Sequence, residues 1–283
     1  MLKLVLPKGR IFARVSALLG DCGLDIHVPD RAYRPTCRDD RLQVKIMKAQ
    51  NIPTLIELGS HDIGITGHDW VQETGAGVEV LLDLGFDPVR IVAAAPRGLD
   101  LRALAAERPL RVATEYEALT ERWLEAQGLP ARIIRSYGAT EVFPPEDADL
   151  IVDNTATGTT LRENGLEILD TLLRSTTQVV ASPAALADPE RRRVIDEILL
   201  LMRAVLDGRD RVLLEMNIPA DRLEQLIATL PAMKSPTVAQ LWGEQGYAVK
   251  AAVPRTDVAR LLPELRRLGA TDILETSIRK VMA

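Results

Sequence analysis

The stretch LIVDNTATGTTLRENGL, residues 150–166, holds the pattern on which the interpretation of the chain depends. Residues 150–152 form an apolar run that predicts the end of a buried strand, and Asp153 terminates it. Thr160 and Glu163 have the spacing of a capping box, which predicts a helix that begins there. We expect this helix to extend through the apolar residues that recur at helical spacing, Leu161, Ile168, Leu169 and Leu172.

The hydroxyl-rich loop between this strand and helix is suited to binding a phosphate group. Backbone N–H groups and the positive end of the helix dipole would point at one small volume, and Gly158 has no side chain to keep an anion away. Asp153 repels phosphate but can accept hydrogen bonds from sugar hydroxyls. The loop therefore predicts a sugar-phosphate site. From the motif alone, a turn that binds no ligand is an equally good interpretation. The expected contacts are Asp153, Thr155, Ala156, Thr157, Gly158, Thr159 and Thr160.

The loop also resembles a known sequence, the phosphoribosyl-diphosphate loop of ATP phosphoribosyltransferases, the first enzymes of histidine biosynthesis. Classical phosphoribosyltransferases, which have a different fold, carry a similar loop with two adjacent acidic residues and one more residue before the glycine. Here Asn154 replaces the second acid and the spacing is shorter, which favours the histidine-pathway family. That family usually has apolar residues where Asn154 and Thr155 stand. The matching residues are Asp153, Thr157, Gly158, Thr160, Leu161, Asn164, Gly165 and Leu166.

Length and composition favour a soluble globular protein of two or three domains. The 283 residues are 47% hydrophobic and 27% charged, and the net charge of -5 argues against nucleic acid as the main partner. Cys22 and Cys37 are too few for a disulfide scaffold, and no cluster of histidine and cysteine has metal-ligand spacing. The first residues do not form a signal peptide, and no apolar run reaches membrane length. We expect a cytoplasmic protein with no membrane partner.

A pair of cations follows the first predicted strand, LKLVL at residues 2–6. Lys8 and Arg10 flank Gly9 there, and ligands bind at the carboxyl ends of strands in α/β sheets. Two solvated surface cations are the more common interpretation of such a pair. The motif LPKGRI, however, resembles the opening of ATP phosphoribosyltransferases, in which this loop lies at the nucleotide and diphosphate end of the cleft. The resemblance implies catalytic roles for Lys8 and Arg10, together with Asp153.

Two further motifs add candidate substrate contacts. HDIGITGHDW, residues 61–70, predicts a buried strand that ends at Gly67 with Asp69 beyond it, and it resembles a signature of the same family. A tight turn is an equally good interpretation of Gly67. Lys48 follows a predicted strand, LQVKIM at residues 42–47, at a position where the family commonly has a basic residue. We therefore take Lys48 as a candidate anion contact.

Glu141 is a candidate for binding either the sugar or a metal ion. It lies in the run 138–141, which matches a family motif on a loop that faces the phosphate loop. Near a sugar diphosphate, a carboxylate can hold Mg²⁺ through water or bind a ribose hydroxyl, so Glu141 and Asp153 are both possible water-mediated contacts of the metal. A surface glutamate beside two prolines is the alternative that the residues alone favour. The direct metal ligands are not predicted.

The order of the predicted elements indicates an α/β fold with three parts. Strands and helices alternate up to residue 207, which argues for two α/β lobes with a cleft between them. We expect lobe I at residues 1–92 and 179–207, and lobe II, with the phosphate loop, at residues 93–178. From residue 208 the order becomes βαββαβ, which predicts a ferredoxin-like domain over residues 208–283. The resemblance implies that the two lobes have a type II periplasmic-binding-protein-like fold.

The resemblance covers the whole chain and implies a specific reaction. ATP and 5-phosphoribosyl diphosphate would condense to N1-(5-phosphoribosyl)-ATP and diphosphate, with Mg²⁺ as cofactor. The segment LPAMKSPTVAQLW, residues 230–242, resembles the regulatory domain of the long form of the family, so we expect inhibition by histidine and a homo-oligomer, dimer or hexamer. Two other functions stay open. One is a solute-binding module without catalysis, and the other is prephenate dehydratase, whose motifs are absent here.

Overall fold

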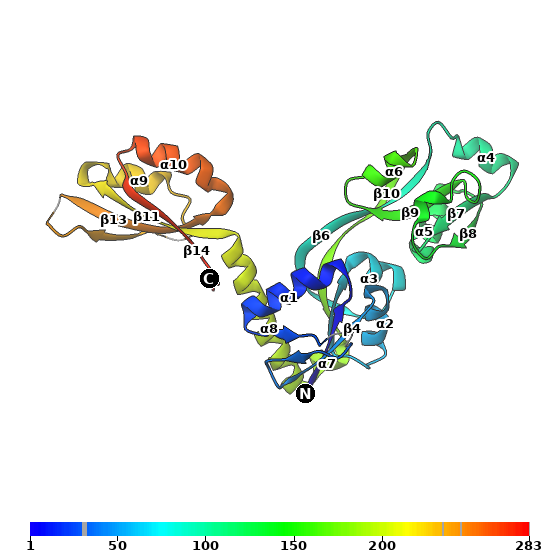
Figure 1. The fold of residues 1–283 in the computed structure, drawn as a ribbon, viewed down its shortest axis with the longest axis horizontal. Helices are drawn as coiled ribbons and strands as arrows, with labels where there is room; N and C mark the ends of the chain where they lie inside the picture. The colour runs from blue at the N-terminus through cyan, green and yellow to red at the C-terminus, as the bar shows by residue number, and fades with distance from the viewer. Residues whose placement is uncertain (30–32, 234, 244, 283) are drawn as a thin grey trace. The chain divides into compact units, whose positions relative to one another are not determined.

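The computed structural model describes residues 1–29, 33–233, 235–243 and 245–282. They form two compact units (Figure 1): the first comprises Met1–Ala17 and Leu24–Ile195, and the second comprises Leu18–Gly23 and Asp196–Ala283. The further division of the catalytic part into lobes at residues 92 and 178 stays a prediction. Among the described residues, no helix combines the length and the apolar character needed to cross a membrane.

The first unit is built on an eight-stranded mixed sheet with the order β4-β1-β5-β10-β6-β9-β7-β8. Two long antiparallel strands, β6 and β10, lie side by side in its middle (Figure 1). On one side β1, β4 and β5 are parallel to one another, and on the other side β7, β8 and β9 are parallel. The strands are β1 (Leu2–Pro7), β4 (Leu42–Met47), β5 (Ile63–Gly67), β6 (Glu79–Pro96), β7 (Leu110–Thr114), β8 (Ala131–Arg135), β9 (Leu150–Thr155) and β10 (Leu166–Ala181), with a small separate pair, β2 (Ile26–His27) and β3 (Thr36–Cys37).

Helices pack against this sheet and complete its hydrophobic cores. One core packs Ile91, Leu110 and Val152 against α5, and another packs Val5 and Val180 against α2. These cores are mostly aliphatic, as the low aromatic content predicts, although the core beside α5 also contains the buried Tyr116. The helices are α1 (Arg10–Cys22), α2 (Ile52–Glu57), α3 (His68–Thr74), α4 (Leu101–Glu107), α5 (Glu117–Gln127), α6 (Thr159–Glu163), α7 (Pro183–Ala187) and α8 (Pro189–Arg209), with 3-10 turns η1 (Ala49–Asn51) and η2 (Thr140–Val142).

The predicted long helix behind the phosphate loop is wrong. Helix α6 ends at Glu163, Gly165 takes a positive φ of 72°, and the chain then continues as β10. Antiparallel pairing with β6 holds β10 extended, and register shifts at bulges carry its apolar residues to different cores. Ile168 packs beside β9, while Leu172 belongs to the core around Val152. The capping box is also wrong, because the N-cap residue is Gly158 and no side chain caps the helix.

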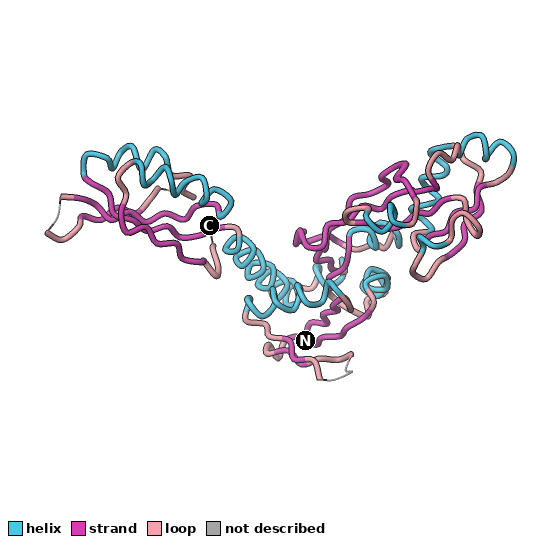
Figure 2. Tube along the Cα trace, turned by 45° about the horizontal axis from the view of Figure 1, so that its top comes forward, coloured by secondary structure: helices cyan, strands magenta, loops and turns pink. Residues whose placement is uncertain are grey.

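The second unit contains a four-stranded antiparallel sheet with the order β12-β13-β11-β14. Along β11, every second residue is buried, and this buried face packs against Leu226 of α9 and Leu261 of α10. Figure 2 shows both helices on one side of the sheet. The chain order βαββαβ with this strand order is ferredoxin-like, which confirms the predicted fold class. The elements are β11 (Arg211–Pro219), η3 (Ala220–Arg222), α9 (Leu223–Thr229), β12 (Thr237–Gln240), β13 (Gly246–Pro254), η4 (Arg255–Asp257), α10 (Val258–Arg267) and β14 (Thr271–Ser277).

Candidate active site

The two halves of the first sheet bring the ends of their strands together. The first turn of α3, directly after β5, contacts the loop after β7 through a hydrogen bond from Tyr116 Oη to Asp69 Oδ2, 2.9 Å long. Gln50, just after β4, donates from Nε2 to Glu115 Oε2 at 3.3 Å. These contacts join segments 47 and 65 residues apart in the sequence. The carboxyl ends of strands from both halves therefore enclose one region, as expected for a ligand site in an α/β protein.

Two cavities lie in this region and share Gln50, Trp70 and Glu115. The smaller cavity has a volume of about 190 Å³ and the larger cavity about 280 Å³. Of the predicted site residues, Arg10, Gly67 and Asp69 line the smaller cavity, and Lys48 lines the larger one. The other lining residues of the smaller cavity are Ile11, Asp87, Val89, Tyr116, Asn154, Ser175, Thr176 and Thr177. Those of the larger cavity are Asn51, Arg135, Ser136 and Tyr137.

The predicted phosphate loop is a solvent-exposed turn between β9 and α6. Ala156, Thr157, Thr159 and Thr160 are exposed, whereas Gly158 is buried and takes a positive φ of 76°. A Cβ at this position would lie 3.2 Å from Ile168 Cδ1, so both the backbone conformation and the space favour glycine. The loop residues 155–160 do not belong to the described lining of either cavity.

Some donors of this loop are already engaged and others are free. The Gly158 amide donates to Thr155 Oγ1 at 2.9 Å, so this amide is satisfied within the turn. The Thr159 amide makes only a long contact of 3.4 Å with Thr157 Oγ1. In the described part of the chain, no hydrogen bond is made by the amides of Ala156, Thr157 or Thr160. These amides remain as donors for an anion, together with the Thr160 hydroxyl and whichever of the Thr157 and Thr159 hydroxyls does not donate in the 2.9 Å bond between them.

Arg162 adds a cation to the loop that the sequence interpretation missed. Its Nη2 donates to Thr159 Oγ1 at 3.2 Å, and its Nη1 lies 4.0 Å from the position that a Cβ on Gly158 would occupy. Guanidinium groups form strong charge-assisted hydrogen bonds with phosphate oxygens. The signal in the sequence was its position three residues after Thr159 in a helix, which turns the side chain back towards the loop.

Asp153 is held in a half-buried position at the end of β9. Its Oδ1 accepts hydrogen bonds from the Asn154 amide at 2.6 Å and from Asn154 Nδ2 at 3.1 Å. Burial raises the pKa of Asp153 from 3.8 to about 6, against the Asn154 amide and the Thr140 hydroxyl, which lower it. The nearby carboxylates of Glu115 and Glu141 raise it further. The carboxyl group is therefore ionised at neutral pH but close to its titration range.

A hydrogen-bond network, buried at Tyr116, Asp69 and Ser175, connects Asp153 to the opposite side of the site. Tyr116 Oη accepts from Asn154 Nδ2 at 3.2 Å and donates to Asp69, whose other oxygen accepts from Ser175 Oγ at 2.6 Å. Burial beside Asp69 raises the pKa of Tyr116 well above its usual range, so the phenol stays protonated. Asp69 is only 5% exposed, and both of its oxygens have protein partners. This carboxylate thus joins the two halves of the sheet.

Gly67 is explained by the same network. A Cβ at Gly67 would lie 2.1 Å from Asp69 Oδ1, closer than any side chain can approach. Glycine is therefore required for the Asp69 carboxylate to fold back over the end of β5. Gly67 also lines the smaller cavity, so a direct substrate contact at this position stays a prediction.

Not all of the predicted cations line the cavities. Arg10 lines the smaller cavity, its side chain is 71% exposed, and its Nε lies 3.5 Å from Asp87 Oδ1. Arg14 Nη1 reaches the same oxygen at 3.7 Å. Lys8 Nζ contacts Tyr33 Oη at 3.2 Å and does not belong to the described lining of the cavities. Arg10 and Lys48 are therefore the predicted cations that the structure brings to the cavities.

The carboxylates around Asp153 bear on the metal prediction. Glu115 and Glu141 both act on the pKa of Asp153, so the three carboxylates share one neighbourhood. Within the described residues, however, no group of three or more histidine, cysteine or acidic side chains has the geometry to hold a metal ion. The described residues therefore place three carboxylates near one another without forming a preformed metal site.

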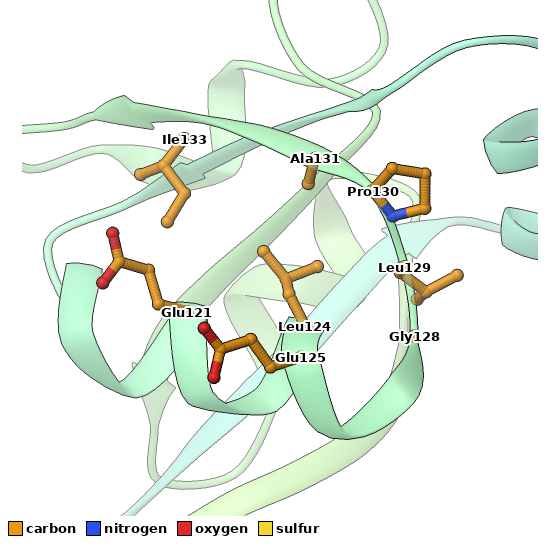
Figure 3. A pocket seen from close by; sticks show the side chains of 8 residues that line it. All are labelled: Glu121, Leu124, Glu125, Gly128, Leu129, Pro130, Ala131 and Ile133. Carbon is orange, nitrogen blue, oxygen red and sulfur yellow. The ribbon is translucent and has the colours of Figure 1, made fainter.

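A third, more voluminous hollow lies elsewhere, on the outer side of α5 and β8. Its volume is about 550 Å³, and its lining combines Leu124, Leu129 and Ile133 with the carboxylates of Glu121 and Glu125 (Figure 3). Among the described lining residues there is no lysine or arginine. Because the two carboxylates repel phosphates, this outer hollow does not suit a nucleotide or a sugar phosphate, despite its size.

Two family models match the chain. The family model described as ATP phosphoribosyltransferase matches residues 48–204, and the model described as HisG, C-terminal domain, matches residues 208–280. The chain belongs to the ATP phosphoribosyltransferase family. Since both models match, it is a long-form member, with the additional C-terminal domain of the family.

Several relatives of this family align over nearly the full length. The ATP phosphoribosyltransferase of Chlorobium phaeovibrioides is 37% identical over 287 residues, covering 100% of this chain and 98% of the relative. That of Desulforudis audaxviator is 39% identical over 286 residues, covering 99% of each chain. A solved structure, the ATP phosphoribosyl transferase (HisG:HisZ) complex from Thermotoga maritima, has a TM-score of 0.63 at 30% identity and covers 71% of this chain and 98% of that one.

Membership of the ATP phosphoribosyltransferase family confirms the predicted class of enzyme. The protein is a glycosyltransferase that catalyses the first step of histidine biosynthesis, in which ATP is joined to a phosphoribosyl group. The full-length alignments also argue against the two other functions considered from the sequence, a solute-binding module and prephenate dehydratase.

Proposed function

We propose that the loop 153–160 holds the ribose 5-phosphate end of 5-phosphoribosyl diphosphate. The observation that carries this proposal is the exposed turn with free amides at Ala156, Thr157 and Thr160. The hydroxyls of Thr155, Thr157 and Thr159 and the guanidinium of Arg162 complete its donors. Backbone amides and an arginine around a small turn match the three terminal oxygens of a phosphate monoester.

Asp153 would bind the ribose hydroxyls beside this loop. Asn154 fixes the carboxylate through Oδ1, and the Thr140 hydroxyl also interacts with the group, so the lone pairs that these two partners leave unused are the acceptors for the sugar. Two neighbouring hydroxyls of a pentose are donors that a carboxylate can accept together. In this arrangement the sugar lies between the loop and the two cavities, so its anomeric carbon faces the space where ATP binds.

Lys8, Arg10 and Lys48 would bind the leaving diphosphate and the triphosphate of ATP. Arg10 and Lys48 line the cavities, while the exposed Lys8 stands two residues before Arg10, in the turn that leads into α1. Magnesium fits as the family's metal ion, because the carboxylates of Asp153 and Glu141 can touch it through water beside the substrate phosphates. Once bound, Mg²⁺ would neutralise charge on the diphosphate.

The reaction then depends on positioning and electrostatics. Adenine N1 attacks the anomeric carbon while the bond to diphosphate breaks, and the electron pair of that bond leaves with the diphosphate. The sugar passes through an oxocarbenium-like state, so the protein must align the reactants and stabilise the departing anion. This chemistry requires no protein nucleophile.

The test is a comparison of Michaelis constants for the two substrates. We expect Thr157→Ala and Gly158→Val to raise KM for the sugar diphosphate at least tenfold, in line with about 1.5–3 kcal/mol for a hydrogen bond to a charged group, and to leave KM for ATP nearly unchanged. The matched control is Thr237→Ala, on the exposed strand β12 of the second unit. Equal effects on both substrates would remove the loop from this role.

Regulation and assembly are further parts of the proposal. The C-terminal unit would bind histidine as an inhibitor, which the match to the family's C-terminal domain supports. The segment 230–242, which suggested this role, includes residue 234, which lies outside the described residues. We also propose a homo-oligomer, dimer or hexamer, and a cytoplasmic location. The solved relative from Thermotoga maritima is itself a complex.

A further inference from the structure

Trp70 is the aromatic side chain that both cavities share. It follows Asp69 in α3, and its indole stacks on the ring of Tyr116 with a centroid distance of 4.6 Å and an interplanar angle of 21°. Tyr116 is 1% exposed and is fixed by its hydrogen bond to Asp69. The indole is half-buried and lines both the smaller and the larger cavity. One side of the indole is therefore held by the protein, and the ring also borders the open space.

The polar groups around this indole have a definite hydrogen-bonding character. Glu115 lines both cavities, and its Oε2 accepts a hydrogen bond from Gln50 Nε2 at 3.3 Å. An ionised carboxylate can only accept hydrogen bonds, so Glu115 selects a ligand that presents a donor. A planar apolar ring with an amino group at its edge satisfies both the indole and the carboxylate.

Adenine is such a ring, and its amino group stands at the six position, beside N1, whereas the amino group of guanine stands at the two position. At the six position adenine carries an amino group, which donates hydrogen bonds, whereas guanine carries a carbonyl oxygen, which a carboxylate repels. Stacking on an aromatic side chain contributes binding but does not distinguish the bases, because every base has a π-face. Discrimination between ATP and GTP would therefore come from the carboxylate, and general affinity for the base from the indole.

We propose that Trp70 stacks on the adenine ring of ATP and that Glu115 accepts a hydrogen bond from its exocyclic amino group. The proposal rests on the function proposed above and names the nucleotide subsite within it. When N1 forms its bond to the anomeric carbon, the adenine ring gains positive charge, part of which is carried by the exocyclic nitrogen. A carboxylate at this nitrogen stabilises that charge as it develops, so Glu115 would lower the barrier as well as select the base.

Equilibrium binding tests the stacking part without any turnover. Tryptophan fluorescence is titrated with ATP in the absence of the sugar diphosphate, in the wild-type chain and in Trp70→Phe. We expect ATP to change the wild-type emission and to leave that of Trp70→Phe unchanged, because Trp242 is fully exposed and Trp123 is bonded to Asp170 outside the cavities. An unchanged wild-type signal at ATP concentrations that saturate activity would overturn the stacking assignment.

Steady-state kinetics tests both residues. Trp70→Leu should raise KM for ATP roughly tenfold, while Trp70→Phe restores it and KM for the sugar diphosphate stays constant. Glu115→Gln should lower kcat and reduce the preference for ATP over GTP at least tenfold. Glu121→Gln, on the outer side of α5, is the matched control. A Glu115→Gln variant with unchanged kcat and base preference, and with an unchanged melting temperature, would refute the role of Glu115.

These results are distinguishable from failure of the phosphate-loop proposal. If the loop did not bind the sugar phosphate, Thr157→Ala would leave KM for the sugar diphosphate unchanged, yet ATP would still change the fluorescence of Trp70. If instead the adenine subsite were wrong, the loop variants would behave as expected while the Trp70 and Glu115 variants altered neither ATP binding nor base preference.

Discussion

Replacing Asp153 by asparagine should stabilise the fold while it removes activity. The carboxyl group has a pKa of about 6 in the folded chain because of burial, compared with 3.8 for an unperturbed aspartate. The difference of about 2.2 pKa units, at about 1.36 kcal/mol per unit, corresponds to about 3 kcal/mol. Above pH 6 this group is ionised in both the folded and the unfolded states, so the folded state bears the full cost of burying the charge.

The sign of the effect follows from the raised pKa. Between pH 6 and pH 3.8 the folded state binds the proton more tightly than the unfolded state, so the cost decreases as the pH falls and is absent below both values. Asp153→Asn should therefore be about 3 kcal/mol more stable at about pH 8, and this gain should disappear near pH 4. The amide oxygen can still accept the hydrogen bond from the Asn154 amide, which limits the structural damage.

The assay is denaturant unfolding of the first unit followed by tryptophan fluorescence. A Trp242→Phe background removes the one tryptophan of the second unit, so that Trp70 and Trp123 report the first unit alone. Activity in the same background should fall strongly in Asp153→Asn, and in the parent it should fall as the pH drops through 6. If Asp153→Asn were less stable than its parent at about pH 8, or if its gain in unfolding free energy were the same at about pH 8 and about pH 4, burial would not be the cause of the raised pKa.

Three further predictions concern single side chains. Asp149, whose side chain is 5% exposed, accepts hydrogen bonds from Arg108 at 2.7 Å and from Arg111 at 3.0 Å, and these partners hold its pKa well below the usual range. Asp149→Asn should therefore lower the free energy of unfolding by about 3 kcal/mol at neutral pH, measured with a denaturant, and this loss should shrink as the pH falls below 3.8. Gly64→Ala should lower the melting temperature by an amount equivalent to about 1–3 kcal/mol, because the new Cβ would lie 2.7–2.8 Å from side chains of Val5, Ile52 and Ile56; an unchanged melting temperature would contradict this packing. Arg162→Ala should raise KM for the sugar diphosphate roughly tenfold and Arg162→Lys less, with KM for ATP as the internal control.

The residues around the phosphate loop could be predicted because their signals are local. An apolar run followed by Asp153 identifies the end of β9, and Gly158 does adopt the positive φ that a side chain would disfavour. The C-terminal fold could be predicted for a similar reason, since the alternation in β11 and the helical spacing of α10 are strong and uninterrupted. Local periodicity is sufficient where each element packs on a single core.

The strand β10 could not be predicted in the same way. Its apolar residues Ile168 and Leu172 are four apart, which fits a helix, and its strand character comes from pairing with β6, whose residues lie about 70–100 positions earlier in the sequence. The bulges in this pairing also disturb the alternation that would have marked a strand. Here long-range hydrogen bonding overrides the local pattern.

Part of the site could not be predicted from the sequence for a related reason. Asp69, Tyr116, Asn154 and Ser175 come from four separate segments, and only the folded sheet brings them into one network. The motif around Gly67 pointed to this region, but it did not distinguish a substrate contact from a carboxylate that joins two halves of the protein. Trp70 belongs to the same motif, but nothing in the sequence indicated that its side chain lines both cavities.

The central claim is that the turn after β9 binds the phosphate monoester of the sugar, and a binding measurement tests it most directly. Ribose 5-phosphate is titrated into the wild-type chain and into Thr157→Ala by isothermal calorimetry, with ribose as the ligand that lacks the phosphate and Thr237→Ala as the control protein. We expect ribose 5-phosphate to bind at least tenfold more weakly to Thr157→Ala than to the wild type and the control. Equal affinity of all three proteins for ribose 5-phosphate would contradict it.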